Sequence, residues 1–153
     1  MAASQPFNKK TAYWGVPWEE IYGYPQARQV GNEIYVSGQF NHDENGDLVA
    51  PAPLGSDGRP SDFSAMGEQM RVTYENIAKL LALYGATLQD VVEETLFVLD
   101  MDAAFAVVGD VRREAFGLQH PQCASNIIGV SRLAQRAQLI EIACKVVIGA
   151  RQL

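Results

Sequence analysis

Glu141 is an ionisable residue within an apolar segment, where it lies between Ile140 and Ile142. A carboxylate buried in such a segment must be paired, bound to a donor, or raised in pKa above the usual value of about 4.3. The structural alternative to an unpaired carboxylate is a salt bridge to Lys145, which would lie further along the same face of the strand.

Metal and nucleotide sites have no convincing signature in the chain. His42 and His120 are far apart, and no HxxxH or Cys/His cluster occurs. Residues 43–47 imitate the start of an EF-hand loop, but Leu54 occupies the position that requires a glutamate, which excludes that calcium site. GxSxG, GxGxxG and Walker motifs are absent. We therefore expect no metal and no cofactor.

Composition favours one globular domain that does not bind nucleic acid. The 153 residues are 48% hydrophobic and 20% charged, which suits a single hydrophobic core. A net charge of −6 would repel RNA on average, and the basic residues form no concentrated run along the chain. We therefore expect no nucleic-acid partner.

The first residues, MAASQPFNKK, lack the apolar stretch of a secretory signal, and no segment approaches the roughly 20 apolar residues of a membrane span. Cys123 and Cys144 form no CxxC pair. We expect both to be buried, reduced and inert, in a cytoplasmic protein with no membrane partner.

The strands expected to position these residues are short and separated by clear turn signals. Residues 1–12 are polar and expected to be loosely ordered. Gly31 and Asn32 predict a tight hairpin, and the polar stretch 41–59 predicts a long loop that is functional or mobile. The expected strands cover residues 27–30, 33–38, 91–99, 126–130 and 139–148.

Two amphipathic helices complete the predicted order β-β-α-β-α-β-β. Asp62 is the expected N-cap of the first, which carries apolar residues at helical spacing from Met66 onward and stops at Gly85. The second covers about 103–116, with Phe105 on its apolar side. This order predicts an α+β fold with both helices on one face of a mixed sheet.

The last predicted strand is apolar on both faces, although the helices can cover only one. The other face needs a cover that this chain does not contain. Another subunit is the simplest source, which predicts an obligate oligomer.

Four motifs in this order resemble the YjgF/RidA family, whose members fold as chorismate-mutase-like homotrimers. They read YGYPQARQVGN, IYVSGQ, ENIAKLLALYGATLQDVVEETLFVLDMD and GVSRLAQRAQLIEI. Together they span about residues 22–148, within a single domain expected over 1–153. The resemblance implies a small-molecule ligand bound in the cleft between adjacent subunits of a homotrimer.

In the deaminating members of this family, an arginine binds the substrate carboxylate and a glutamate positions or activates the water that attacks an imine carbon. The resemblance places the glutamate at Glu141, the pocket tyrosine at Tyr24 and the pocket serine at Ser37. Tyr24 could equally be an interface aromatic. A structural hydrogen bond would explain Ser37 as well as a substrate contact does.

Three further family positions carry other residue types here. The arginine position, counted back from Arg132, falls on Ser125; a family asparagine matches Gly109; and a family cysteine matches Ile127. The carboxylate clamp is therefore missing. Arg132 and Arg136 are the obvious substitutes, although a surface ion pair is the simpler explanation of Arg132.

The resemblance thus predicts small-molecule binding at the intersubunit cleft, with hydrolytic deamination of an imine or enamine as the nearest family activity. The alternative is a non-catalytic ligand-binding or regulatory trimer. The endoribonuclease or translation-inhibitor label that the family has often carried is disfavoured by the acidic composition. The missing arginine separates the first two hypotheses, because an enzyme needs another cation in the cleft.

Overall fold

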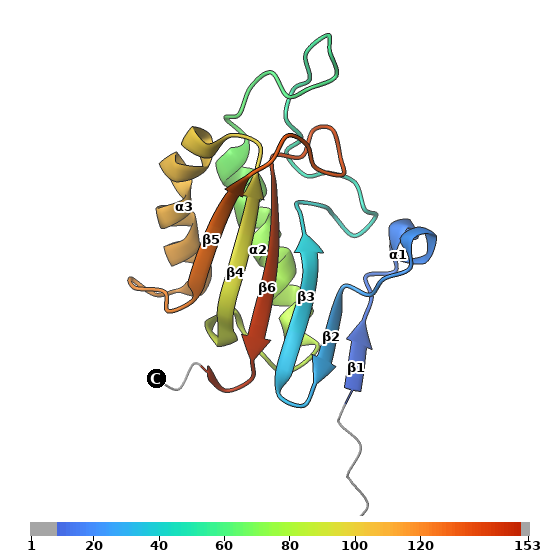
Figure 1. Cartoon of the computed structure of the whole chain (residues 1–153), viewed down its shortest axis with the longest axis vertical. Coiled ribbons are helices and arrows are strands. Elements are labelled where there is room, and N and C mark those ends of the chain that lie inside the picture. Colours follow the sequence, from blue (N-terminus) through green and yellow to red (C-terminus); the bar gives the residue numbers. More distant parts are fainter. Residues whose placement is uncertain (1–8, 151–153) are drawn as a thin grey trace, which may run out of the picture.

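One six-stranded sheet, in the order β1-β2-β3-β6-β4-β5, forms one layer of the structure, and two long helices form the other (Figure 1). The structure is a computed structural model, and it describes residues 9–150. The strands are β1 (Lys9–Ala12), β2 (Ala27–Val30), β3 (Glu33–Gln39), β4 (Val91–Val98), β5 (Ala124–Gly129) and β6 (Ile140–Val147). The helices are α1 (Pro17–Tyr22), α2 (Met66–Ala82), the 3-10 helix η1 (Leu88–Asp90) and α3 (Met101–Phe116).

The predicted α+β fold is confirmed. β4 and β5 pair in parallel, whereas the other neighbouring strands are antiparallel, so the sheet is mixed. Both α2 and α3 cover the same face (Figure 1). The hairpin between β2 and β3 turns at Gly31, whose φ of +62° is a conformation that glycine adopts without strain.

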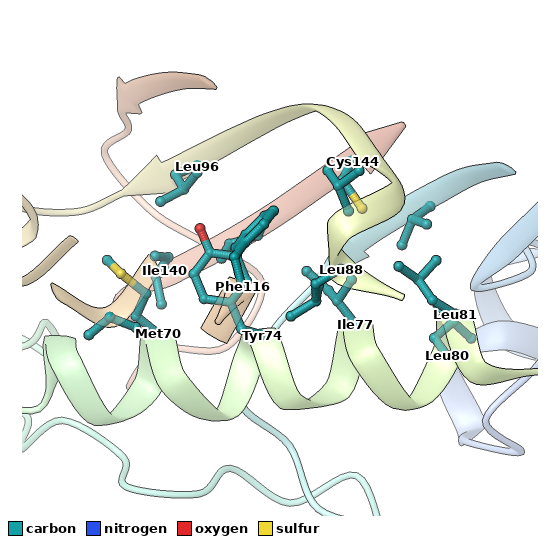
Figure 2. Packing of buried hydrophobic residues seen from close by; sticks show 14 of the residues in the cluster. Met70, Tyr74, Ile77, Leu80, Leu81, Leu88, Leu96, Phe116, Ile140 and Cys144 are labelled. Carbon is teal, nitrogen blue, oxygen red and sulfur yellow. The ribbon is translucent and has the colours of Figure 1, made fainter. Parts of the chain in front are cut away.

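The core lies between the sheet and α2, whose apolar residues recur at helical spacing and point toward the strands (Figure 2). Met70, Tyr74 and Ile77 are at most 1% exposed; Met70 lies beside the buried Ile140 of β6, and Ile77 lies beside Leu88. Each side chain of this size contributes about 1.5–3 kcal/mol by leaving water. The helical spacing in the sequence therefore identifies the core-facing stripe of α2 correctly.

The N-terminal segment is more ordered than we expected. Residues 9–12 form the edge strand β1, with Lys10 opposite Gln29 of β2; residues 1–8 lie outside the described part of the chain. Polar side chains do not prevent strand formation at an edge, because the backbone there pairs with a neighbouring strand. The short helix α1 is a second element that we did not predict.

Three details of the predicted helices are wrong. Asp62 does not cap α2: its carboxylate accepts a hydrogen bond from the Ser64 N–H (2.7 Å) in a preceding turn, and α2 starts later. α3 begins two residues earlier than expected, because Asp100 caps it through the Ala103 N–H (2.8 Å). Phe105 is 63% exposed and faces away from the sheet.

The sheet face opposite the helices, called the uncovered face below, has no cover within residues 9–150. Alternate residues of β6 are fully buried beneath the helices, whereas Glu141, Ala143 and Lys145 point the other way. Tyr35 of β3 lies opposite Lys145 on this face and is 45% exposed. The face is therefore more polar than the sequence indicated, because the apolar Ile140 and Ile142 both belong to the covered face.

Among residues 9–150, no helix is both long and apolar enough to cross a membrane.

Candidate functional site

Glu141 lies on the uncovered face of β6, and its carboxylate rests directly over the backbone of Gly38. A Cβ atom added at Gly38 would come within 2.5 Å of the Glu141 Cδ and 2.6 Å of its Oε2. A side chain at position 38 would therefore displace the carboxylate. The glycine of the IYVSGQ motif thus leaves the space that the Glu141 carboxylate occupies.

Burial raises the pKa of Glu141 above its ordinary value, and a hydrogen bond with the Gln138 side chain offsets part of that effect. The structural alternative that we considered, a salt bridge to Lys145, is not among the ion pairs of the described residues. The Lys145 ammonium instead lies 5.6 Å from the centre of the Tyr35 ring. Glu141 is thus a half-buried carboxylate with a raised proton affinity.

Tyr24 lies close to Glu141, and the short helix α1 places it there. Burial raises the pKa of Tyr24, and the negative charges of Glu141 and Glu19 raise it further. Gly23, at φ +76°, ends α1 and turns the chain toward Tyr24. The resemblance therefore pairs two residues, Tyr24 and Glu141, that the fold also brings into electrostatic contact.

Glu19, which sequence reasoning missed, holds this segment in place. Its buried carboxylate accepts hydrogen bonds from the Trp14 and Gly15 N–H groups and from the Gln26 Nε2, each at 2.8 Å, and from the Val16 N–H at 3.0 Å. A carboxylate with several backbone donors is a strong local anchor. Pro17 in the first turn of α1, followed by an acidic residue, was the available sequence signal.

Ser37 makes the structural hydrogen bond that we kept as an alternative. Its Oγ donates to the Pro25 carbonyl at 2.8 Å, and its backbone N–H donates to the Gln26 carbonyl at the same distance. Both bonds tie β3 to the segment that follows Tyr24. Ser37 therefore positions the tyrosine, and a pocket of about 570 Å³ lies beside that segment, lined by Tyr24, Glu19 and Pro25 among others.

The other three predicted residues lie elsewhere. Ser125 pairs with Glu94 and Ile127 with Leu96, whereas Glu141 pairs with Phe97. Because side chains alternate along β4, Ser125 and Ile127 point to the helix side of the sheet and Glu141 points to the uncovered face. Gly109 lies in α3, where a Cβ atom would come 3.3 Å from the Arg113 Nη1.

The six predicted residues thus form two groups within one chain. Tyr24, Ser37 and Glu141 lie together around the uncovered face. Ser125 and Ile127 of β5 and Gly109 of α3 lie on the helix side of the sheet.

An arginine of the same chain fills the space beside Ser125, and it is neither of the two we suggested. The Arg112 Nη2 donates to the Ser125 Oγ at 2.8 Å, and its Nε donates to the Glu94 Oε1 at 2.6 Å. Ser125 also donates to the same Glu94 oxygen at 3.1 Å. Arg132 lies beyond the opposite end of β5, so it cannot substitute for the clamp within this chain.

Glu94 is the buried centre of this network. Its side chain is 1% exposed, and its second oxygen accepts a hydrogen bond from the Tyr74 hydroxyl at 2.8 Å. Burial alone would lower the pKa of Arg112, but the Glu94 carboxylate outweighs it and the pKa is raised. The guanidinium is therefore charged, and Glu94 neutralises it. A charged residue on the apolar stripe of α3, one turn after Val108, was the sequence signal that could have revealed Arg112.

The remaining candidates offer no nucleophile or metal site. Burial raises the pKa of Cys123 to about 12, and burial also raises the pKa of Cys144, so both thiols are protonated at neutral pH. Within residues 9–150, no group of three or more histidine, cysteine or acidic side chains could hold a metal ion. His42 is instead buried against the rings of Trp14, Trp18 and Phe40.

Comparisons with known proteins agree with this fold. The family model described as Endoribonuclease L-PSP matches residues 18–148. A RutC family protein of Pyrococcus abyssi is 36% identical over 72% of this chain and 75% of its own length. A protein of Dermatophagoides farinae named 2-iminobutanoate/2-iminopropanoate deaminase is 29% identical over 85% of this chain and 89% of its own.

Solved structures show the same architecture. The crystal structure of a YjgF/YER057c/UK114 family member from Mycobacterium tuberculosis has a TM-score of 0.71 and 24% identity, and the match covers 92% of this chain and 100% of that one. At this identity the likeness concerns the fold. The family model and the sequence relatives carry the assignment further: this chain belongs to the YjgF/RidA family.

Proposed function

We propose that this chain forms a homotrimer in the cytoplasm and binds a small molecule in the cleft between adjacent subunits, where Glu141 activates water for hydrolysis of an imine or enamine. The observation that carries the proposal is the position of Glu141, held over Gly38 on the uncovered face with a raised pKa. A carboxylate whose pKa lies closer to neutral is a better proton acceptor for general-base catalysis.

The chemistry needs no cofactor. Glu141 accepts a proton from a water molecule as the oxygen forms a bond to the imine carbon. The carbon–nitrogen bond then breaks, protons pass to the nitrogen, and ammonia leaves as the carbonyl forms. An enamine first takes a proton at carbon to become the imine. Tyr24, close enough to Glu141 for its pKa to respond, orients the reacting group through its hydroxyl.

The trimer explains why the predicted residues form two groups. In a closed ring, one edge of each subunit meets a different edge of the next. Such an arrangement would place the group around Glu141 of one subunit beside β5 and α3 of its neighbour. The uncovered face, with Tyr35 and Ala143 partly exposed, supports the assembly because it lacks a cover in one chain.

The proposed substrate lacks the negatively charged carboxylate of an imino acid. Arg112 is the cation nearest Ser125, but Glu94 already neutralises it at 2.6 Å. A substrate carboxylate would have to compete with that buried partner. The Dermatophagoides farinae relative is named for deamination of 2-iminobutanoate and 2-iminopropanoate. We propose that this chain shares the reaction type and prefers imines or enamines without a carboxylate.

Ammonia release from a panel of freshly generated imines, with and without a carboxylate, tests the proposal. We expect turnover of neutral imines, with Glu141→Gln lowering kcat by at least about 100-fold. Glu75→Gln is the matched control, because Glu75 is exposed on α2 and the charge change is the same. Equal activity of the wild type and Glu141→Gln on every substrate would refute the catalytic role.

A non-catalytic ligand-binding trimer is the second candidate, and Arg112 favours it because the guanidinium beside Ser125 is already bound to Glu94. It predicts ligand binding without turnover, and binding that survives Glu141→Gln. The same assay with a binding measurement distinguishes the two. The net charge of −6 gives no support to a role on RNA.

A further inference from the structure

Two loops at one end of the sheet enclose a pocket of about 370 Å³ that lies apart from Glu141. One loop belongs to the long connection between β3 and α2, and the other connects β5 to β6; both project from the same end of the molecule (Figure 1). The Ala52 N–H donates to the Ala137 carbonyl at 3.0 Å and joins them directly. The pocket is thus bounded mainly by two segments distant in sequence, with Leu99 from the connection between β4 and α3.

Gln69 of α2 anchors both loops from below. It is fully buried, and its Nε2 donates to the carbonyls of Ala50 and Ala137, each at 2.9 Å. Its Oε1 accepts from the Leu139 N–H at 2.8 Å. One core side chain therefore fixes the spacing of the pocket walls, and the pocket is formed before any ligand arrives.

The first loop is itself closed by backbone hydrogen bonds. The Gly55 N–H donates to the Arg59 carbonyl at 2.7 Å, and the Asp57 carboxylate accepts from the Arg59 N–H at 3.0 Å. Gly58 has φ +75°, and a Cβ atom there would lie 3.5 Å from the Arg136 Nη1. The Arg136 guanidinium of the second loop therefore lies against the tip of the first.

Three arginines and one aspartate line this pocket: Arg59, Arg132 and Arg136 against Asp57. None of the three arginines takes part in an ion pair within residues 9–150. The chain as a whole carries a net charge of −6, so this gathering of cations is a local reversal of its electrostatic character. We propose that the pocket is a second binding site, for a small organic anion that carries a carboxylate or phosphate group.

The apolar residues that line the pocket indicate that the ligand also has an apolar part. Phe63, Leu99 and Val130 line the same pocket as the arginines. A volume of about 370 Å³ suits a small molecule rather than a bare ion. An apolar body would rest on these side chains while its anionic group binds the guanidinium groups, which can bind carboxylate or phosphate oxygens in pairs. Excess positive charge favours a dianion over a monoanion.

This site does not depend on the proposed hydrolysis, because Glu141 and Tyr24 do not line the pocket. Titration calorimetry of the intact protein at low ionic strength, with phenyl phosphate, benzoate and inorganic phosphate as probes, tests it. We expect saturable binding in the order phenyl phosphate, benzoate, inorganic phosphate. A stronger response to benzoate than to phenyl phosphate would identify a carboxylate rather than a phosphate as the natural head group, within the same proposal.

Arg132→Gln and Arg136→Gln should each weaken phenyl phosphate binding by at least about tenfold, since each removes a charged donor. Both side chains are exposed, so these variants should fold. Arg28→Gln, an exposed arginine on β2 outside the pocket, is the matched control and should leave binding unchanged. Glu141→Gln should also leave it unchanged.

No saturable binding at millimolar probe would overturn the proposal. So would equal weakening by Arg28→Gln, which would mean general attraction by charge. Loss of binding in Glu141→Gln with retention in Arg132→Gln would assign the probe to the intersubunit cleft and would also overturn it.

Discussion

The Nη2 of Arg112 lies 2.8 Å from the Oγ of Ser125, the position at which the family resemblance expects an arginine. A guanidinium is thus present beside this position, but α3 supplies it instead of β5. The replacement is not equivalent, because the Arg112 Nε binds the buried Glu94 at 2.6 Å. An arginine held in this way has a structural role first, and any role in ligand binding comes second to it.

Imino acids should therefore be poor substrates. We expect 2-iminopropanoate to be hydrolysed at least about 100-fold more slowly in kcat/KM than by an arginine-bearing relative, which corresponds to about 2.7 kcal/mol. Ser125→Arg should not restore the activity, because its guanidinium would meet that of Arg112. Steady-state ammonia release measures both. A wild-type rate equal to that of the relative would show that Arg112 does bind the carboxylate.

Breaking the Arg112–Glu94 pair from one side should destabilise the protein. Arg112→Gln leaves the Glu94 carboxylate buried without its cation, and we expect a loss of about 3–5 kcal/mol in the free energy of unfolding. Adding Glu94→Gln to this variant should recover most of the lost free energy of unfolding. Urea denaturation at fixed protein concentration gives both values.

Arg113→Gln is the control for that experiment. Its guanidinium is half-exposed and its partner Asp110 is almost fully exposed, so the change should be within about 1 kcal/mol. If Arg112→Gln were as mild as Arg113→Gln, the ion pair would contribute little to stability.

Glu141 should reduce stability at neutral pH. Its pKa is raised in the folded state, so the folded chain binds the proton more tightly than the unfolded chain does. The group favours folding fully only below its unfolded pKa of about 4.3, and this contribution is lost as the pH rises through the folded pKa.

Glu141→Gln should accordingly be more stable than the wild type at pH 7, and the difference should vanish near pH 4. Thermal or urea unfolding at both pH values provides the comparison. A variant less stable than the wild type at pH 7 would mean that a cation of a neighbouring subunit pairs with Glu141.

Two adjacent residues of β6 separate assembly from folding. Ala143 points to the uncovered face, whereas Ile142 is fully buried beneath the helices. Ala143→Asp should yield a folded monomer, because it places a charge in the proposed interface. Ile142→Asp should lower the free energy of unfolding by several kcal/mol and so unfold the chain, since it buries the charge in the core. Light scattering and circular dichroism report the two outcomes, and a wild-type monomer at micromolar concentration would contradict the trimer.

The sequence alone determined those parts of the fold that depend on local chemistry. Helical spacing of apolar residues identified α2, and the pair Gly31 and Asn32 identified the first hairpin. The resemblance then selected Glu141 and Tyr24, which the fold brings close together. The helical spacing and the hairpin turn each lie within a few neighbouring residues, where periodicity and turn preferences act directly.

Only the tertiary structure could decide what depends on distant contacts. β1 is polar and becomes a strand only because it pairs with β2. Asp62 does not cap α2, because its carboxylate accepts a hydrogen bond within the preceding turn. The partner of Arg112 is equally a matter of packing, because Glu94 belongs to another element of the chain.

The arginines of the second pocket illustrate the same limit. Arg59 and Arg132 are more than seventy positions apart along the chain, so no basic run was visible, yet the two loops that Gln69 holds together bring them to one cavity. Charge depends on distance in space rather than in sequence. Local patterns therefore determined the elements, and the packing of those elements decided which charged groups meet.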